Sequence, residues 1–342
     1  MIKFIPHFLL VCSACLVLSA CTPAPPAVLH LSGPTMGTTY NVKFVERDEI
    51  KPAQLQAKID RLLVNINQLM STYIPDSELS RFNQYKGVDK VPLSAETLSV
   101  MAEAKRLGEL SGGMLDVTLG PVINLWGFGP QGRPEKVPSE QEIKSAKATS
   151  GLDKLVLGPT WARKQLPTLY VDLSTIAKGY AVDRVAELLE EHKVRDYLVE
   201  IGGELRVSGN KGAGQDWRIA VEKPITAQRA VQRVLSIGNN GLATSGDYRI
   251  YFEDEGQRYS HLINPLTAKP ITHNLVSVTV VHPSSMTADG LATALNVMGK
   301  DKAWLIAKQY NLAVLLITRE NGEYIEYTSA AFEPFILDPV KD

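Results

Sequence analysis

Cysteine is nearly absent from this sequence and is confined to its N-terminus. The chain has 342 residues and three cysteines, Cys12, Cys15 and Cys21, with none after them. This excludes a disulfide framework, a cysteine-ligated zinc site, an iron–sulfur cluster and a cysteine nucleophile from the rest of the chain.

The sequence also lacks an excess of charge of either sign. It has 36 basic and 37 acidic side chains, a formal net charge of −1, and an apolar content of 44%. The near balance removes the basic surface of a nucleic-acid-binding protein, so we expect no nucleic acid among its partners. The apolar content is that of a globular protein with a substantial core.

The N-terminus predicts a targeting segment. Residues 8–18 form an apolar run that is too short to span a bilayer comfortably but is typical of a signal peptide. Leu18, Ser19 and Ala20 then precede Cys21, which resembles a bacterial lipobox. We therefore predict a lipoprotein signal peptide at residues 1–20, lipidation of Cys21 and a membrane anchor. An ordinary secretory signal and a transmembrane anchor are the alternatives.

The remainder divides into a short tether and a globular region. Residues 21–30 are rich in proline and predict an extended tether, and residues 31–342 predict one catalytic domain, with a division into two subdomains as an option. Helical spacing of apolar residues predicts helices at residues 55–69, 96–110, 175–193, 286–298 and 301–310. Strands are expected around Val42 and Phe44 and at residues 169–173, 197–201, 205–208, 217–221, 231–237, 248–252, 259–263, 276–281 and 312–318. Runs of strands between groups of helices predict an α+β fold with largely antiparallel sheets and flanking helices.

A glycine-rich string in an irregular region carries no function. Residues 127–132 match the G-x-G-x-x-G pattern of a dinucleotide-binding fold, but that pattern works only where a strand turns into a helix. Pro130 and Pro134 prevent a helix from starting there, and residues 112–138 as a whole predict no regular structure.

Three segments contain candidate functional side chains. Residues 172–180 lie where a buried strand is expected to enter a helix, so Asp172, Lys178 and the free N–H groups of the first turn could bind an anionic ligand; a Ser/Thr helix cap with an exposed lysine is the alternative. Asp289 and Thr293 are four residues apart and share a helix face, which suits a hard cation such as Mg²⁺. An acidic residue that only caps its helix is the alternative there.

The third segment contains His261 at the end of a predicted strand. A histidine in this position is either structural or a general base or phosphate contact. The apolar and aromatic residues 114–129 form either a loop that covers the core or a wall for a flat ligand.

Eight motifs together resemble the ApbE-type FAD:protein FMN transferases, in order and over about residues 31–330. They lie at residues 33–38, 71–73, 114–121, 124–129, 172–180, 244–246, 260–270 and 288–293. The resemblance implies that FAD is split at its pyrophosphate, that FMN is joined through a phosphoester to a threonine or serine hydroxyl of an acceptor protein, and that AMP leaves.

The resemblance also implies roles for individual residues. Positions that match FAD contacts are Met36, Tyr73, Met114, Leu115, Asp116, Asp172, Lys178 and Ile263. The Mg²⁺ site would comprise Thr175 through its carbonyl, Asp289 and Thr293, and His261 would lie close to the phosphates. Either His261 or Asp289 would act as the base, with His261 favoured because a metal-bound carboxylate is a weak base.

Three departures from the family and three functional alternatives accompany the resemblance. Ala292 stands where some members have a second acidic residue, Asn264 and Ala268 stand where Asp and Gly are frequent, and Lys178 replaces the Glu of other members. The alternatives to transfer are a Mg²⁺-dependent FAD pyrophosphatase and a non-catalytic flavin-binding lipoprotein. Expected acceptors are subunits of the Na⁺-translocating NADH:quinone reductase, of Rnf-type complexes, or of other periplasmic flavoproteins, at the periplasmic face of a bacterial membrane.

Overall fold

A computed structural model describes residues 27–47, 49–130, 137–224, 230–246, 251–254 and 256–337. The predicted signal peptide, Cys21 and most of the predicted tether lie outside these residues, as do residues 248–250 of one predicted strand. The first strand begins at Val28, within the residues assigned to the tether. None of the helices in the described ranges has the length and apolar character needed to cross a bilayer.

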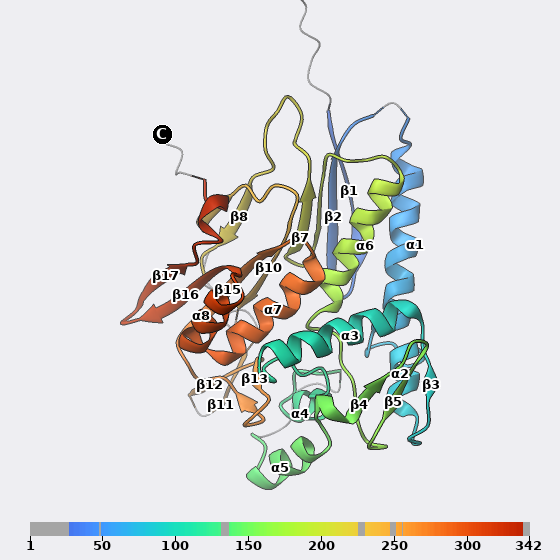
Figure 1. Ribbon diagram of the computed structural model, residues 1–342, viewed down its shortest axis with the longest axis vertical. Helices are drawn as coiled ribbons and strands as arrows, with labels where there is room; N and C mark the ends of the chain where they lie inside the picture. The colour runs from blue at the N-terminus through green and yellow to red at the C-terminus, as the bar shows by residue number, and fades with distance from the viewer. Residues whose placement is uncertain are drawn as a thin grey trace, which may run out of the picture.

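An eight-stranded sheet organises the molecule (Figure 1). All neighbouring strands are antiparallel, which confirms the predicted α+β fold with largely antiparallel sheet. In spatial order the strands are β1 (Val28–Thr35), β2 (Thr38–Val45), β6 (Tyr197–Ile201), β7 (Glu204–Ser208), β10 (Gly241–Gly246), β15 (Leu275–His282), β16 (Ala313–Glu320) and β17 (Glu323–Thr328).

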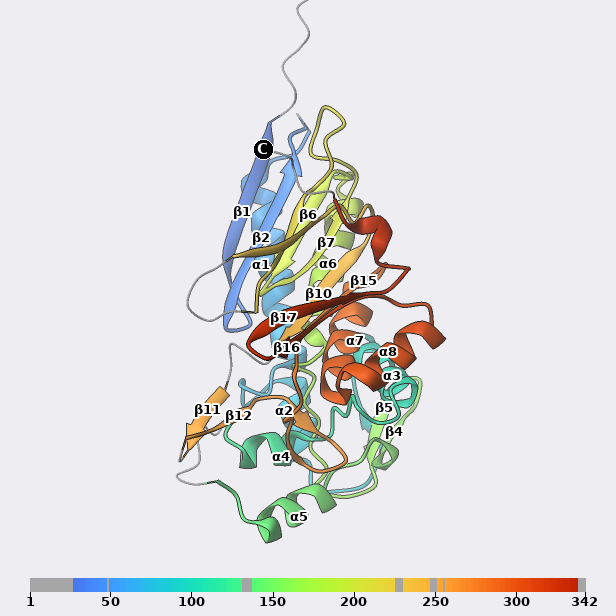
Figure 2. The ribbon, with the colours of Figure 1, turned by 90° about the vertical axis from the view of Figure 1, so that its left-hand side faces the viewer.

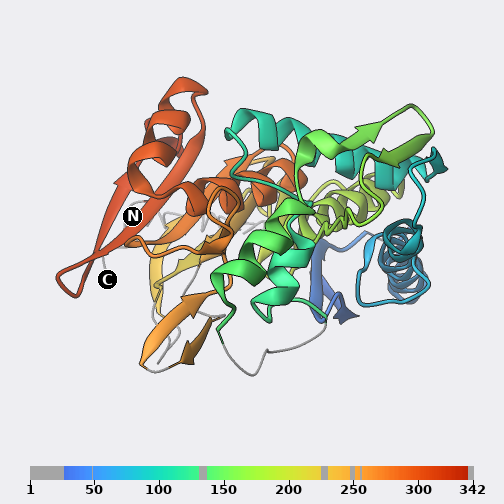
Figure 3. The ribbon, with the colours of Figure 1, turned by 90° about the horizontal axis from the view of Figure 1, so that it is seen from below.

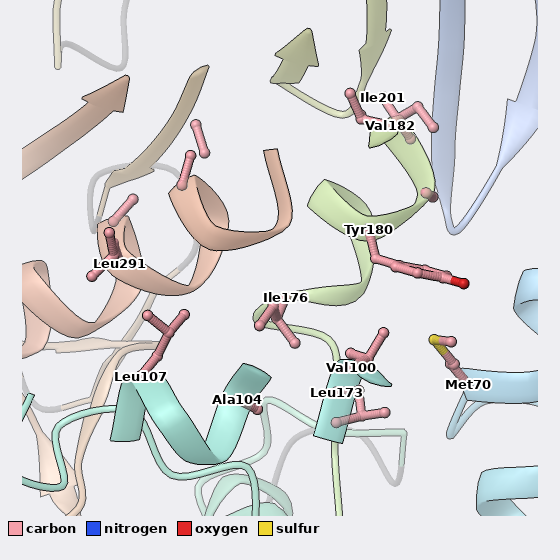
Figure 4. Packing of buried hydrophobic residues seen from close by; sticks show 14 of the residues in the cluster. Met70, Val100, Ala104, Leu107, Leu173, Ile176, Tyr180, Val182, Ile201 and Leu291 are labelled. Carbon is pink, nitrogen blue, oxygen red and sulfur yellow. The ribbon is translucent and has the colours of Figure 1, made fainter. Parts of the chain in front are cut away.

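Helices cover one face of this sheet (Figures 1 and 2). They are α1 (Pro52–Met70), α3 (Ala95–Leu110), α6 (Ala177–Glu191), α7 (Ser285–Met298) and α8 (Lys300–Gln309). Strand β2 alternates its side chains, so Tyr40, Val42 and Phe44 point into the main core. Leu107 of α3, Ile176 before α6 and Leu291 of α7 belong to the same core (Figure 4).

The opposite face is covered in part by a separate hairpin, β8 (Ile219–Glu222) with β9 (Val231–Leu235). Its apolar side chains form a second core with Leu205, Leu242 and Phe332, which precedes the short helix η2 (Glu333–Phe335).

A third group of small elements lies at one end of the molecule, where α4 and α5 lie near the β11–β12 hairpin (Figures 1 and 3). These elements are α2 (Glu78–Gln84), β3 (Val91–Pro92), α4 (Gly120–Leu125), α5 (Glu140–Ala148), η1 (Leu152–Lys154), β4 (Leu155–Leu157), β5 (Trp161–Lys164), β11 (Tyr251–Asp254), β12 (Gln257–Ser260), β13 (Ile263–Asn264) and β14 (Lys269–Pro270). A third apolar cluster around Trp126 lies among them.

Some predicted elements differ from the structure. The region expected to be irregular contains α4, because Pro121 lies in the first turn, where proline is compatible with a helix. The predicted strand at residues 169–173 is not a strand: Asn83 supplies both hydrogen bonds to Val171, at 2.8 Å each, that a neighbouring strand would have supplied. Residues 259–263 are divided between β12 and β13, and α6 begins at Ala177 rather than at residue 175.

Helices α6 and α7 approach each other closely at Gly179. A Cβ atom at this position would lie 2.3 Å from the backbone oxygen of Ser285 and 2.8 Å from Cβ of Asp289. One turn later, Asp183 of α6 accepts hydrogen bonds from the backbone N–H groups of Ser285 and Met286 at the start of α7. The absence of a side chain at Gly179 therefore sets how the two helices meet.

We expect Gly179→Ala to destabilise the protein, although Gly→Ala in an exposed helix is stabilising by about 1 kcal/mol. The new methyl group must displace the backbone of α7, so the free energy of unfolding should fall by about 2–3 kcal/mol, measured by chemical denaturation. Gly290→Ala in α7 is the matched control, because its Cβ would meet only the flexible ends of Leu107, Ile176 and Leu115. Equal losses in the two variants would contradict the role assigned to the α6–α7 contact.

Candidate active site

A cavity of about 520 Å³ lies where the three apolar clusters meet. Its walls are mainly apolar, and its polar groups come from the start of α6, the middle of α7 and the turn between β6 and β7. The residues used below that line it are Met114, Leu115, Asp116, Phe128, Thr175, Lys178, Gly202, Gly203, Glu204, His261, Ile263, Asp289 and Thr293. Its size and mixed lining are those of a ligand site.

Three charged side chains meet in this cavity. Lys178 Nζ lies 2.7 Å from Glu204 Oε1 and 3.9 Å from Asp289 Oδ1. Asp289 Oδ2 accepts a hydrogen bond from the backbone N–H of Gly179 at 3.0 Å. Glu204 Oε2 and Thr175 Oγ1 are buried without a hydrogen-bond partner. The cavity thus brings together one ammonium, two carboxylates and unpaired oxygen atoms.

The charges shift one another's protonation. Burial, with a smaller contribution from the Glu204 charge, raises the pKa of Asp289 to about 7, against the opposing effect of Lys178. Burial alone would lower the pKa of Lys178, but Asp289 and Glu204 raise it above its usual value. Two carboxylates therefore share one ammonium, and the negative charge on Asp289 is incompletely compensated.

Asp289 and Thr293 both line the cavity, as their spacing predicts. Helix α7 begins at Ser285 with Ser284 as its cap, so Asp289 lies beyond the first turn. The alternative in which Asp289 caps its own helix is wrong, because its hydrogen-bond partner is Gly179 of another helix. Thr175 lines the same cavity. Among the described residues no group of three or more His, Cys, Asp or Glu side chains forms a metal site, so hydroxyl and carbonyl oxygens would have to complete one.

The segment at the start of α6 matches neither of its two interpretations in full. The cap residue is Ile176, which makes no side-chain capping bond, so a Ser/Thr cap is excluded. Lys178 faces Glu204 within the cavity rather than lying unpaired on the surface, and the Gly179 N–H already binds Asp289. An anionic ligand would therefore meet Lys178 as part of a charge cluster.

Aromatic and apolar side chains form the wall beside His261. The His261 ring lies edge-on to Phe128, with 6.3 Å between ring centroids. Met114, Leu115, Asp116 and Ile263 also line the cavity, and burial raises the pKa of Asp116. The loop at residues 114–129 is thus a wall of the cavity as well as a cover for the core. Described residues 127–130 follow a helix, α4, rather than a strand, which confirms that the glycine string is no dinucleotide motif.

Three predicted ligand contacts lie outside the lining. Tyr73 is 65% exposed, and partial burial together with the nearby Asp172 charge raises its pKa. Asp172 donates its backbone N–H to Val117, so it borders the wall at residues 114–117. Met36 lies at the turn between β1 and β2, and Thr38 of that turn would lie 3.0 Å from a Cβ at Gly202. These residues can contact only a ligand that extends beyond the cavity.

Glu204 is the charged cavity residue that the motifs do not reveal. It is the first residue of β7 and is 4% exposed. A signal is present in the sequence, because Gly202 and Gly203 separate two apolar strands and an acidic residue opens the second. Its partner Lys178 lies far away in the chain, so the sequence alone does not indicate the ion pair.

Comparison with known proteins identifies the family. The ApbE family model matches residues 36–316. The chain belongs to the ApbE family. It is 49% identical over 328 residues to a protein of Vibrio cholerae named FAD:protein FMN transferase, covering 96% of this chain and 98% of that protein. A Haemophilus influenzae protein of the same name is 49% identical over 314 residues, covering 90% of this chain and 91% of that one.

Solved structures agree with this assignment. The flavin transferase ApbE from Vibrio cholerae superposes with a TM-score of 0.86 at 48% identity, covering 91% of this chain and 100% of that one. The apo flavinyl transferase ApbE from Pseudomonas stutzeri gives 0.85 at 38% identity, with coverages of 93% and 99%.

The departures from the family have visible structural consequences. Ala292 is 1% exposed and packs in the main core, so it adds no oxygen to the site. Ala268 takes the left-handed conformation, with φ of 56°, and its backbone oxygen accepts a hydrogen bond from Trp126 Nε1. The turn expected to need glycine therefore forms with alanine.

The raised pKa of Asp289 predicts how stability depends on pH. The folded state retains this proton up to about pH 7, whereas the ordinary value is 3.8, so the contribution is fully present below about pH 4 and is lost as the pH rises through 7. Asp289→Asn should therefore raise the free energy of unfolding at pH 8 in a chelator by about 2 kcal/mol and change it little at pH 4. Asp301→Asn, at an exposed site, is the control. A variant less stable than wild type at pH 8 would contradict the assigned burial cost.

Proposed function

We propose that this protein transfers FMN from FAD to a threonine or serine hydroxyl of an acceptor protein and releases AMP. The observation that carries this proposal is the identity of 49% to a protein named FAD:protein FMN transferase, over nearly the whole of both chains. The apolar cavity with charged and oxygen groups at one end supports it, since FAD combines flat rings with an anionic pyrophosphate.

The donors in the cavity fit Mg²⁺. This ion prefers oxygen ligands and keeps several waters, so Asp289, the Thr293 hydroxyl and the Thr175 carbonyl are a suitable set. The buried, incompletely compensated Asp289 carboxylate and the unpaired Glu204 Oε2 indicate that the cavity favours additional positive charge. When bound, Mg²⁺ would neutralise phosphate charge and stabilise the departing AMP.

The chain's own residues would bind and orient the substrate. Lys178 is protonated and would attract the pyrophosphate, and the wall at Met114, Leu115 and Ile263 would pack against a flat ring. Tyr73 and Asp172, beside the cavity, would contact the part of FAD that extends out of it.

The transfer needs a base for the acceptor hydroxyl. We propose His261, because Asp289 in contact with a cation would be a poor proton acceptor. The acceptor oxygen would form a bond to the FMN phosphorus, the bond from that phosphorus to the bridging oxygen would break, and the bridging oxygen would leave with AMP. The hydroxyl proton would pass to an imidazole nitrogen of His261.

The location and the acceptors are also part of this proposal. Cys21 would be lipidated after removal of residues 1–20, and the domain would be held at the periplasmic face of the membrane. Acceptors would be subunits of the Na⁺-translocating NADH:quinone reductase or Rnf-type complexes. Support comes from the lipobox-like sequence and from the family resemblance.

The proposal predicts covalent flavinylation. The protein, FAD, Mg²⁺ and an acceptor domain should yield acceptor whose mass has increased by one FMN, and a chelator should abolish the product. We expect His261→Gln to lower the rate about 100-fold or more, since a positioned general base contributes about that factor. His273→Gln, at a histidine outside the cavity lining, is the control.

Two outcomes would change the assignment. Free FMN and AMP formed without acceptor, and no modified acceptor among several tested, would indicate a pyrophosphatase. FAD binding that persists in Asp289→Ala, with no turnover by the wild type, would indicate a flavin-binding protein without catalysis.

A further inference from the structure

The turn between β6 and β7 is held rigidly beside the cavity. On the outer face of the sheet, a chain of hydrogen bonds runs from His30 through Asn41 to Glu200, with heavy-atom distances of 3.0 and 2.8 Å. Glu200 then accepts the backbone N–H of Gly203 at 2.7 Å. Three strands thus anchor the turn that precedes Glu204.

The same turn packs against the Lys178 side chain. A Cβ at Gly202 would lie 3.4 Å from Cδ of Lys178, so the glycine leaves room for the lysine stem. The stem passes the turn and the ammonium reaches Glu204 Oε1 at 2.7 Å. At one-third exposure the ammonium still has access to the cavity, but Glu204 fixes its position.

Asp289 has one oxygen engaged and one open. Oδ2 binds the Gly179 N–H, whereas Oδ1 lies 3.9 Å from Lys178 Nζ, beyond hydrogen-bond distance. Lys178 is the competitor for this oxygen, because it lies between the two carboxylates. Removal of the Glu204 contact would leave Asp289 as the nearest carboxylate for the ammonium.

We propose that Glu204 is a positioning residue that holds Lys178 on the β7 side of the cavity and thereby keeps Asp289 Oδ1 open to a divalent cation. This inference rests on the proposed function only through its cation site. Glu204 acts through Lys178, so the contact matters as well as the charge.

Binding of Mn²⁺, used as a probe for Mg²⁺, tests this role without flavin or acceptor. Free Mn²⁺ is measured by electron paramagnetic resonance during titration of the protein, and thermal denaturation verifies that each variant is folded. Glu204→Gln should weaken Mn²⁺ binding by about tenfold, a typical minimum for close charge pairs in desolvated sites. Glu326→Gln is the control, since Glu326 is also a partly buried partner of an ion pair but lies outside the cavity lining.

Two further variants separate the contact from its alternatives. Glu204→Asp retains the charge but shortens the side chain, so it should weaken binding as Glu204→Gln does; binding equal to wild type would show that charge alone matters and overturn the proposal. Adding Lys178→Gln to Glu204→Gln removes the competitor and should restore binding. A double variant that stays as weak as Glu204→Gln would make Glu204 itself a cation ligand and also overturn it.

The result is independent of the transferase reaction. The expected Mn²⁺ pattern in a protein that never modifies an acceptor would refute the proposed function and leave the role of Glu204 intact. A wild-type protein that binds no Mn²⁺ would overturn both the cation site and the role of Glu204.

Discussion

The close contact between α6 and α7 at Gly179 determines where the charged groups of the cavity lie. Because residue 179 has no side chain, its N–H reaches Asp289 Oδ2, and the backbone of α7 lies against α6. Asp183, one turn further along α6, binds the first N–H groups of α7 and the Arg206 side chain of β7. Lys178 then extends from α6 to Glu204 two residues before Arg206. Two ion pairs therefore tie α6 to β7 in the same register, and one backbone contact adds α7 to them.

The cavity arises from a separation of strands within the sheet. Strand β10 pairs with β15 along its whole length but with β7 only at Gly241 and Leu242. Beyond these residues the two strands diverge, and Thr244 and Glu204 line opposite sides of the cavity that lies between them. The three apolar clusters end here, so the charged groups lie next to low-dielectric walls, where electrostatic interactions are stronger than in water. A ligand with flat rings and a charged centre matches this distribution.

Local patterns predicted a large part of this structure, and long-range contacts account for the rest. Helices α1, α3 and α7 follow from apolar periodicity, and the shared face of Asp289 and Thr293 follows from their spacing. Strand β10 contains two glycines and few apolar residues, so it has no strand signal, and its place in the sheet depends on β15. Residues 169–173 have a strand-like pattern, but Asn83, far away in the sequence, takes the place of a neighbouring strand. The role of Glu204 depends on Lys178 in the same non-local way.

The charge balance of the cavity links its chemistry to the absence of cysteine with which the sequence begins. One ammonium faces two buried carboxylates, which is an unfavourable environment for an anionic pyrophosphate. The high pKa of Asp289 expresses the same imbalance, because a proton reduces the surplus of negative charge when nothing else does. A divalent cation would do so more completely, and with no thiolate or imidazole cluster among the described residues, its donors would be oxygens, which select hard ions. Proton and cation would then compete for one carboxylate, so binding of the cation and of the anionic substrate should strengthen each other.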